Sequence, residues 1–287
     1  MKLKDRVAII TGGGRGIGEA MALAFAREGA NLTLVSRTYQ EIENVAKAVK
    51  KYSVDALTIT GDVSEERTAE EVVRKTIEKY SKIDVLVNCA GIYGPIGRFD
   101  KNDWEEWKYT LNVNLFGTLL FIRKVIPHMM ERRYGKIINM SGGGTGGGPL
   151  PNFTAYAASK VAVVKLTETL AQEYKEFNID INAIAPGAVN TKLLDQVLKV
   201  GKDAGEEFYK KSLAQKESGG TPRELAAELA VYLASSDSDG LTGKLISAPW
   251  DDWKNFKPEQ TGDISKSSVY TLRRINNMKF FEKKSDK

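Results

Sequence analysis

Short apolar runs rich in β-branched residues alternate along the chain with longer amphipathic stretches. Six such runs occupy residues 7–10, 32–35, 56–60, 85–87, 136–140 and 179–184. The stretches between them have the periodicity and length of helices. Strands that alternate with helices predict βαβ units, which build a parallel sheet covered by helices on both faces. We therefore predict a Rossmann-type, doubly wound α/β fold.

The chain shows neither an internal repeat nor a proline- or serine-rich linker, which favours a single domain. We expect a catalytic body over residues 1–248 and a C-terminal extension over 249–287. The polar, glycine-flanked segment 191–220 predicts a helical lid over a site, with a surface excursion as the alternative. The sequence Thr221-Pro222-Arg223-Glu224 predicts a capping box that opens a helix over 222–235.

The net charge of +5 arises in the tail, because residues 254–287 hold nine Lys and Arg against four Asp and Glu, whereas the rest holds 33 of each. A basic tail can bind phosphates or membranes, but a solvated segment is the simpler interpretation. The body shows no basic face interleaved with aromatic residues, so no nucleic-acid partner is expected. No apolar run approaches the ~20 residues of a membrane span, so no membrane partner is expected.

The cysteine content of the chain is one residue, Cys89. A single cysteine provides neither a disulfide framework nor a cysteine cluster for a metal ion, so we expect no metal site. The same observation favours a reducing compartment, and we expect a cytoplasmic protein.

A glycine-rich segment directly follows the first apolar run. Gly12, Gly16 and Gly18 have the spacing Gly-x-x-x-Gly-x-Gly rather than Gly-x-Gly-x-x-Gly. Small residues let the backbone approach a pyrophosphate, and the N-terminus of the following helix offers N–H groups and a positive dipole end. A glycine cluster can also be a simple tight turn. Its place between the first strand and the first helix nevertheless predicts a dinucleotide site.

The end of the second run indicates which dinucleotide is bound. NAD-dependent enzymes usually present a carboxylate there, which accepts a hydrogen bond from the ribose. This chain presents Ser36 and Arg37 instead, and Arg15 of the glycine loop is a second candidate cation. Because a guanidinium suits a 2′-phosphate, we predict NADP(H) as the cofactor, with ordinary surface arginines as the alternative.

Tyr156 and Lys160 begin a long helical pattern, four residues apart and therefore on one helix face. A tyrosine hydroxyl titrates near 10, too high for a general base at neutral pH. A neighbouring ammonium favours the phenolate, and we expect it to lower the pKa of the tyrosine. Such a pair can move a proton while a hydride moves at carbon. Alone, Tyr-x-x-x-Lys occurs often by chance.

Combined with the glycine loop, this pair makes the chain resemble the short-chain dehydrogenase/reductase family over about residues 5–248. Four more stretches match the family in order: Asp62-Val63, Asn88-Cys89-Ala90-Gly91, Asn112-Val113-Asn114-Leu115 and Pro186-Gly187 followed by Thr191. The resemblance implies cofactor contacts from Gly12, Gly14, Arg15, Gly16, Ile17, Gly18, Ser36, Arg37, Asp62, Val63, Asn88, Ala90, Gly91, Tyr156, Lys160, Pro186, Gly187, Val189 and Thr191.

The resemblance also implies a reaction, the interconversion of a small-molecule carbonyl and a secondary alcohol. Tyr156 is then the proton donor in reduction or the base in oxidation. Lys160 holds the nicotinamide ribose and tunes Tyr156, and Asn114 positions a water in a proton relay through Lys160. Because the family commonly pairs its fourth and fifth helices, we expect a homodimer or homotetramer.

The chain departs from the family at the serine that polarises the substrate carbonyl. That serine stands about 13 residues before the tyrosine. Counting from the fifth strand places Gly142 there, and counting back from Tyr156 places Gly143. We expect Ser141 to replace it, with Thr145 as the alternative. Side chains alternate along a strand, so the glycine run has to bend the backbone to aim Ser141 at the site.

The segment Trp250-Asp251-Asp252-Trp253 bears on the substrate. Two aromatic rings beside two carboxylates can hold a sugar, so a sugar or nucleotide-sugar substrate is one hypothesis, with a packed terminus as the alternative. A 3-oxoacyl thioester is a second hypothesis, based on its frequency in the family. The displaced serine and the basic tail also leave a different class open, an NADP(H)-binding sensor or scaffold with a vestigial active site.

Overall fold

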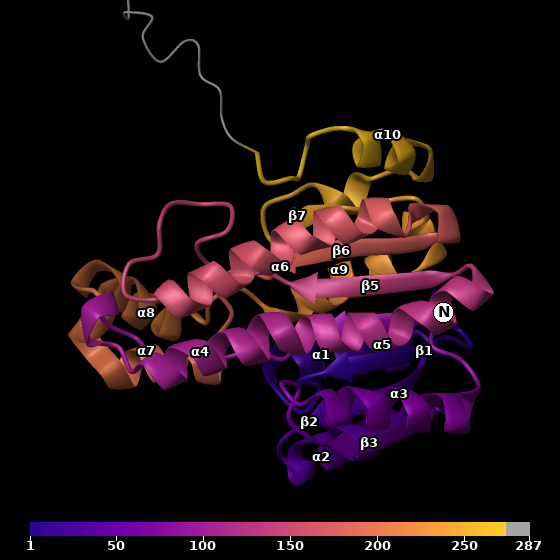
Figure 1. Ribbon diagram of the computed structural model, residues 1–287, viewed down its shortest axis with the longest axis horizontal. Coiled ribbons are helices and arrows are strands. Elements are labelled where there is room, and N and C mark those ends of the chain that lie inside the picture. The colour runs from indigo at the N-terminus through magenta and orange to yellow at the C-terminus, as the bar shows by residue number, and fades with distance from the viewer. Residues whose placement is uncertain (274–287) are drawn as a thin grey trace, which may run out of the picture.

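The structure is a computed structural model that describes residues 1–273, and its centre is a parallel seven-stranded sheet (Figure 1). The strand order is β3-β2-β1-β4-β5-β6-β7, and every pairing is parallel. The order reverses between β1 and β4, which is the switch point where such sheets bind ligands. The predicted doubly wound Rossmann-type fold is confirmed. The strands are β1 (Val7–Thr11), β2 (Asn31–Ser36), β3 (Ala56–Thr60), β4 (Val85–Asn88), β5 (Gly135–Met140), β6 (Ile179–Ala185) and β7 (Leu245–Ser247).

Helices cover both faces of the sheet, because its strands are apolar on both sides; all five residues of β1 are buried. One hydrophobic cluster joins α1, α2 and α9 to one face, and a second joins α3, α5 and the end of α6 to the other. The helices are α1 (Gly16–Arg27), α2 (Tyr39–Val49), α3 (Glu66–Tyr80), α4 (Trp104–Leu111), α5 (Gly117–Arg132), α6 (Thr154–Glu173), α7 (Lys192–Val200), α8 (Glu206–Ser218), α9 (Arg223–Ala234) and α10 (Thr261–Lys266).

The carboxyl ends of the strands point toward α7 and α8, which lie beyond this edge of the sheet in Figure 1. These two helices form the segment that the sequence predicts as a helical lid. Val197 of α7 and Ala204, between the helices, are buried in a third cluster with Phe153 and Tyr156. The predicted segment is therefore helical and packs against the tyrosine.

The opposite, amino edge of the sheet is held together by ion pairs to one buried carboxylate. The fully buried Asp84, just before β4, accepts a hydrogen bond from the Val7 amide at 2.9 Å and lies 3.0 Å from Arg132 and Lys82 and 3.6 Å from Arg6. A buried carboxylate is tolerated only with such partners, because its desolvation costs several kcal/mol. This cluster therefore ties the starts of β1 and β4 to α5.

The C-terminal extension follows the free edge of β7. Lys244 Nζ donates to the carbonyls of Ser267 and Val269 at 2.7 and 3.1 Å, and the Leu245 amide donates to the Tyr270 carbonyl at 2.8 Å. The extension thereby supplies acceptors for an edge that would otherwise be open. The end of the predicted basic tail, residues 274–287, lies outside the described residues.

Two local predictions are corrected. The capping box does not form: α9 begins at Arg223 with Pro222 as its N-cap, and no side chain caps it. The reason is that Thr221 is held elsewhere, since its amide donates to the Ala188 carbonyl and its side chain faces Gly187. In addition, β7 is absent from the predicted runs because it is only three residues long.

Within residues 1–273, no helix combines the length and the apolar character that crossing a bilayer requires.

Candidate active site

The glycine loop packs its backbone directly against the end of β4. A Cβ on Gly12, whose φ is +65°, would lie 2.9 Å from the Ala90 Cα, and a Cβ on Gly18 would overlap the Gly12 carbonyl. The Thr11 hydroxyl completes the junction by accepting the amides of Cys89 and Ala90 at 3.1 and 3.2 Å. Only glycine fits this approach, and the loop opens into the N-terminus of α1. These residues fit a dinucleotide pyrophosphate.

The other predicted members of this region lie around that loop. Ile17 packs partly buried against the core, and a Cβ on Gly14 would lie 2.8 Å from the Glu41 side chain. Gly16, at φ +58°, faces Thr191, whose hydroxyl accepts the Leu193 amide and caps α7. Helix α7 therefore begins against the loop that would hold the cofactor phosphates.

Both candidate cations for a 2′-phosphate are engaged by other groups. Arg15 donates to the Glu41 carboxylate at 3.1 Å, and Lys192 donates to the same oxygen at 3.0 Å. Burial alone would raise the pKa of Glu41, but the two cations outweigh it and hold the pKa below its ordinary value. The second candidate, Arg37, donates to the Tyr109 hydroxyl at 3.1 Å and remains more than half exposed.

Asp62, the predicted adenine contact, is held firmly. It accepts the Tyr109 hydroxyl at 2.6 Å and the Ser64 amide and hydroxyl at 2.9 and 2.7 Å. Burial alone would raise the pKa of Asp62, but these hydrogen bonds keep it below its ordinary value. Sequence reasoning missed Tyr109, since no motif marks it; only the fold brings α4 next to β3.

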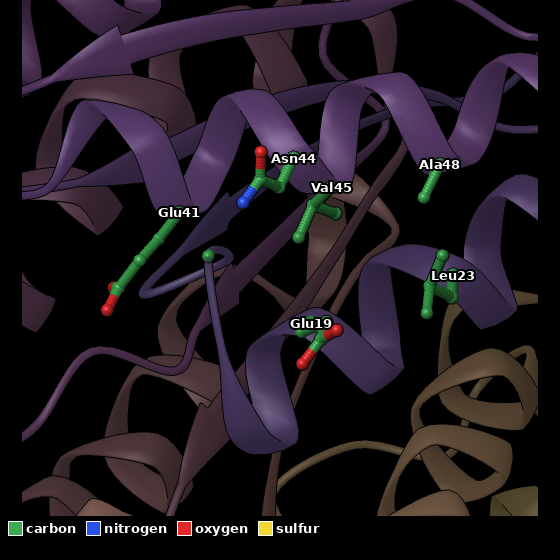
Figure 2. Close-up of a pocket in the computed structure, with 7 residues that line it drawn as sticks. Glu19, Leu23, Glu41, Asn44, Val45 and Ala48 are labelled. Atoms are coloured by element: carbon green, nitrogen blue, oxygen red, sulfur yellow. The ribbon is translucent and has the colours of Figure 1, made fainter.

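A cavity of about 180 Å³ adjoins Gly14 between α1 and α2 (Figure 2). Glu19 and Leu23 line it from α1, and Asn44 is among the residues that line it from α2. Its volume is well below the ~300 Å³ of small-molecule sites, and α6 contributes nothing to it. This hollow is therefore not the catalytic site.

Tyr156 and Lys160 lie on one face of α6 and are both buried. Lys160 Nζ donates to the Met140 carbonyl at 2.9 Å and lies 5.8 Å from the centre of the Tyr156 ring. Burial lowers the pKa of Lys160 to about 8. Burial also raises the pKa of the Tyr156 phenol above its ordinary value. The expected lowering of the Tyr156 pKa is therefore wrong for this arrangement, because desolvation outweighs an ammonium that faces a carbonyl.

Asn114 connects three elements of the site. Its Nδ2 donates to the Ile92 carbonyl at 2.9 Å and to the Ser159 hydroxyl at 3.0 Å, and its Oδ1 accepts the Ile92 amide at 2.9 Å. It lies in a π-helical turn, Asn112–Phe116, between α4 and α5. Such turns often occur at functional sites. A Cβ on Gly91 would lie 3.3 Å from Asn114 and 3.4 Å from Lys160, so this glycine leaves room for both side chains.

The loop after β5 contains the departure from the family serine. A Cβ on Gly142 would overlap the Tyr156 hydroxyl and lie 2.6 Å from its Cζ. Gly142 therefore faces the tyrosine, as counting from the strand predicts. Ser141 Oγ lies 2.8 Å from Thr145 Oγ1, and Thr145 donates to the Gly142 carbonyl at 2.8 Å. The structure brings Ser141 and Thr145 together, but their hydroxyls bond one another.

The remaining predicted residues lie nearby, mostly in structural contacts. Asn88 Nδ2 donates to Asn139 Oδ1 at 2.9 Å, which links β4 to β5. Ser36 Oγ accepts the Thr38 amide at 3.0 Å, and Val63 is buried against Gly117. Pro186, Gly187 and Val189 follow β6, where Val189 pairs with Gly220 at the end of the lid segment. The thiol of Cys89 has its pKa raised to about 11 by burial.

Aromatic side chains pack next to the ring of Tyr156. The Tyr93 ring stands edge-on to Tyr156, with centroids 4.7 Å apart, and 5.1 Å from Phe153. Phe208 of α8 lies 4.8 Å from Phe153. Sequence reasoning missed Tyr93 and Phe208; the one available signal was the place of Tyr93 two residues after Asn-Cys-Ala-Gly.

The tryptophan–carboxylate segment packs elsewhere. Trp253 is buried against Tyr232, and its Nε1 donates to the Ala248 carbonyl at 3.0 Å. Asp251 accepts the Ser247 amide, and Asp252 accepts the Asn255 amide group. Trp250 is exposed. These contacts match the alternative of a terminus packed on the body.

A parallel sheet with a glycine loop at its switch point and a tyrosine–lysine pair at the same edge defines a Rossmann-type oxidoreductase. The family described as short chain dehydrogenase matches residues 6–200. This chain belongs to the short-chain dehydrogenase/reductase family, whose members use a nicotinamide cofactor, NAD or NADP.

Among named relatives, the 3-oxoacyl-[acyl-carrier-protein] reductase FabG of Thermotoga maritima is 34% identical over 251 residues, 86% of this chain and 97% of its own. Levodione reductase of Leifsonia aquatica is 36% identical over 253 residues, 85% of this chain and 93% of its own.

Solved structures agree. NAD⁺-bound xylitol dehydrogenase aligns with a TM-score of 0.80 at 28% identity, covering 86% of this chain and 98% of that one. Levodione reductase aligns with a TM-score of 0.78 at 31% identity, covering 90% of this chain and 98% of that one.

Proposed function

We propose that this chain is an NADP(H)-dependent oxidoreductase that interconverts a ketone and a secondary alcohol. The observation that carries the proposal is the convergence of Tyr156, Lys160 and Asn114 at the carboxyl edge of the sheet, beside the glycine loop. When bound, the nicotinamide cofactor supplies the hydride in reduction and accepts it in oxidation.

In reduction, Tyr156 gives its proton to the carbonyl oxygen while the carbonyl carbon receives the hydride. The Tyr156 phenol carries this proton at neutral pH, because the ordinary pKa of a tyrosine, about 10, already lies well above that pH. Lys160, next to Tyr156 on the helix face, would hold the nicotinamide ribose when the cofactor is bound, and it would return a proton to the phenolate. Asn114, bonded to Ile92 and Ser159, positions a water that leads this relay to solvent.

The preference for NADP(H) rests on Arg15 and Arg37, which lie beside the glycine loop and the end of β2. Both bond internal partners, Glu41 and Tyr109. A 2′-phosphate carries enough charge to compete for these guanidiniums, and Arg37 follows β2 where an NAD-dependent enzyme usually presents a carboxylate. The test is the dissociation constant for NADPH against NADH, measured by fluorescence titration; equal constants would contradict the preference.

The substrate proposal follows the surroundings of the Tyr156 hydroxyl. Its aromatic neighbours form an apolar cluster, which suits a ketone with an apolar substituent. A relative named as a 3-oxoacyl reductase and another named as levodione reductase support the same substrate chemistry. The hypothesis of a sugar substrate loses its support, because Trp253, Asp251 and Asp252 make local hydrogen bonds within the C-terminal segment.

The experiment is NADPH consumption by the full-length protein against 3-oxoacyl thioesters, cyclic ketones and keto sugars, with Tyr156→Phe as control. We expect turnover of apolar ketones that the control loses. NADPH binding without turnover of any carbonyl would favour the sensor alternative instead.

We also propose a homo-oligomer that uses the surface of α4, the π-helical turn and α6. Trp104, Phe116 and Val161 expose 55%, 52% and 38% of their surfaces there. Large apolar side chains on adjacent helices are typical of a subunit contact. Light scattering that gives the mass of one chain would contradict this.

A further inference from the structure

In the short-chain dehydrogenase/reductase family the substrate carbonyl oxygen has two hydrogen-bond donors, the tyrosine that protonates it and the serine that polarises it. Removing a donor of the second kind typically costs about 10²–10³ in rate. In this chain Gly142 stands beside the Tyr156 hydroxyl, where the family has its serine, and it has no side chain. The question is which group supplies the second hydrogen bond.

The neighbouring hydroxyls have already used their protons. A hydroxyl has one proton to donate. Thr145 gives its proton to the Gly142 carbonyl, so the contact between Ser141 and Thr145 consumes the proton of Ser141. Ser141 is also nearly fully buried. In this arrangement neither residue has a proton left for a substrate, and Ser141 acquires one only if Thr145 rotates.

Tyr93 has an uncommitted proton, and its ring packs edge-on against the ring of Tyr156. No group within residues 1–273 hydrogen-bonds the Tyr93 hydroxyl, and the same holds for Tyr156. Within the described residues, the buried side-chain atoms that lack a hydrogen-bond partner belong to Asn88, Tyr134, Tyr232 and Ser247. The hydroxyls of Tyr93 and Tyr156 are not among them. Both hydroxyls are therefore accessible to solvent. The centres of the two rings lie 4.7 Å apart.

Tyr93 is also held in place by its neighbours in the chain. Ile92 is bonded through both its amide and its carbonyl to Asn114. Gly94, at φ +70°, packs so closely on Thr110 of α4 that a Cβ there would overlap the threonine hydroxyl. With both flanking residues fixed and its ring packed on Phe153, Tyr93 is preorganised, which is what makes a donor effective in catalysis.

The protonation states fit a donor. Burial raises the pKa of Tyr93 above its ordinary value, so it stays a neutral phenol through the physiological range. Burial raises the pKa of Tyr156, and the neighbouring Tyr93 raises it further.

We propose that Tyr93 is a catalytic residue whose hydroxyl replaces the missing family serine by donating a hydrogen bond to the substrate carbonyl. In reduction the carbonyl carbon gains the hydride and the oxygen gains the proton of Tyr156. Tyr93 keeps its own proton throughout and stabilises the charge that develops on oxygen. This inference rests on the proposed ketone reductase activity.

The test is Tyr93→Phe, which keeps the ring and removes the hydroxyl, in the full-length protein with NADPH and a ketone that the wild type reduces. We expect kcat to fall about 10²-fold, with the dissociation constant for NADPH within twofold of wild type. Tyr134→Phe is the matched control, because it removes an unpartnered hydroxyl at the amino edge; it should leave kcat unchanged.

A spectroscopic readout separates hydrogen bonding from packing. The infrared carbonyl stretch of that ketone, bound to enzyme and NADP⁺, should move to lower frequency in the wild type and in Ser141→Ala. In Tyr93→Phe most of that shift should disappear. A Tyr93→Phe variant with wild-type kcat and carbonyl stretch, or a Ser141→Ala variant that carries the full loss, would overturn the assignment to Tyr93.

The two proposals fail in different ways. If Tyr156→Phe abolishes turnover and Tyr93→Phe does not reduce it, the ketone reductase stands and only the role of Tyr93 is refuted. If the wild type binds NADPH and reduces no ketone, the proposed function fails, and the donor role of Tyr93 fails with it.

Discussion

At the amino edge of the sheet, the carboxylate of Asp84 meets three cationic side chains and a backbone amide. At the carboxyl edge, the Tyr156 hydroxyl meets no partner within residues 1–273, and Lys160 meets one carbonyl. Both edges bury charged or ionisable groups. One edge satisfies them internally and stabilises the fold, whereas the other keeps donors unsatisfied so that a ligand can complete them.

The two edges separate hydrogen bonds that stabilise the fold from donors that remain available to a substrate. A fully paired buried charge contributes little to chemistry, because its hydrogen bonds are already made. Unpaired buried groups cost stability, and active sites tolerate this cost because the groups then act on the substrate. The comparison predicts that substitutions at the two edges separate into losses of activity and losses of stability.

The largest effect is expected at the carboxyl edge. In Gly142→Ala the new Cβ would overlap the Tyr156 hydroxyl. Because the general acid is displaced, we expect kcat/KM to fall about 10²–10⁴-fold with little change in Tm. Gly147→Ala in the same loop is the control, since nothing lies within 4 Å of its Cβ. Steady-state kinetics and thermal unfolding check this; an active Gly142→Ala would refute the placement of Tyr156.

The amino edge should respond in the opposite way. Asp84→Ala removes the acceptor of the buried Val7 amide and the partner of three half-buried cations, and we expect the free energy of unfolding to fall by about 1–3 kcal/mol. Activity per folded molecule should not change, because the site lies at the other edge. Asp100→Ala, at an exposed ion pair, is the control. Denaturant titration measures the difference in the free energy of unfolding. Loss of activity in folded Asp84→Ala would contradict the separation of stability and activity between the two edges.

The unfavourable burial of Lys160 should make the free energy of unfolding depend on pH. Its folded pKa, about 8, lies below the ordinary value of 10.5, so between these values the unfolded state binds more protons. Unfolding free energy therefore rises with pH in that window, by up to about 3 kcal/mol from this group.

Lys160→Met should remove that rise and gain stability at pH 7 while losing turnover. Lys165→Met, on the exposed side of the same helix, is the control. Unfolding free energies at pH 7 and pH 10 without cofactor measure the effect; an identical pH slope in Lys160→Met and wild type would contradict it.

The smallest effect concerns Arg37. If it binds the 2′-phosphate, Arg37→Ala loses a charge-assisted contact worth about 1.5–3 kcal/mol. We expect NADPH affinity to fall by roughly 10–150-fold and NADH affinity to change little. Arg74→Ala, in an exposed helical pair, is the control. Calorimetric titration distinguishes the outcomes, and an equal loss for both cofactors would refute phosphate recognition by Arg37.

Much of this arrangement can be predicted from the sequence, because strand–helix alternation fixes the sheet and places the glycine loop at its edge. Tyr156, Lys160 and Asn114 converge as their motifs indicate. Sequence patterns do not predict strand register or which hydrogen-bond partner a side chain takes. Thr221 has the chemistry of a cap, yet it is turned toward Gly187 by a neighbouring backbone bond.

The missed residues share a physical reason. Tyr93 and Tyr109 matter because segments distant in sequence pack next to Tyr156 and Asp62. The pKa of Tyr156 is another example. Helical spacing places Lys160 beside it, but only the folded structure shows the ammonium facing Met140 and the phenol desolvated.

The most direct test of the whole account is a single-turnover measurement with Tyr156→Phe. The protein is loaded with NADPH, mixed with a ketone that the wild type reduces, and followed by the loss of nicotinamide absorbance. The account predicts unchanged NADPH binding and a hydride-transfer rate at least about 10²-fold below wild type. A rate equal to wild type would contradict proton donation by this phenol.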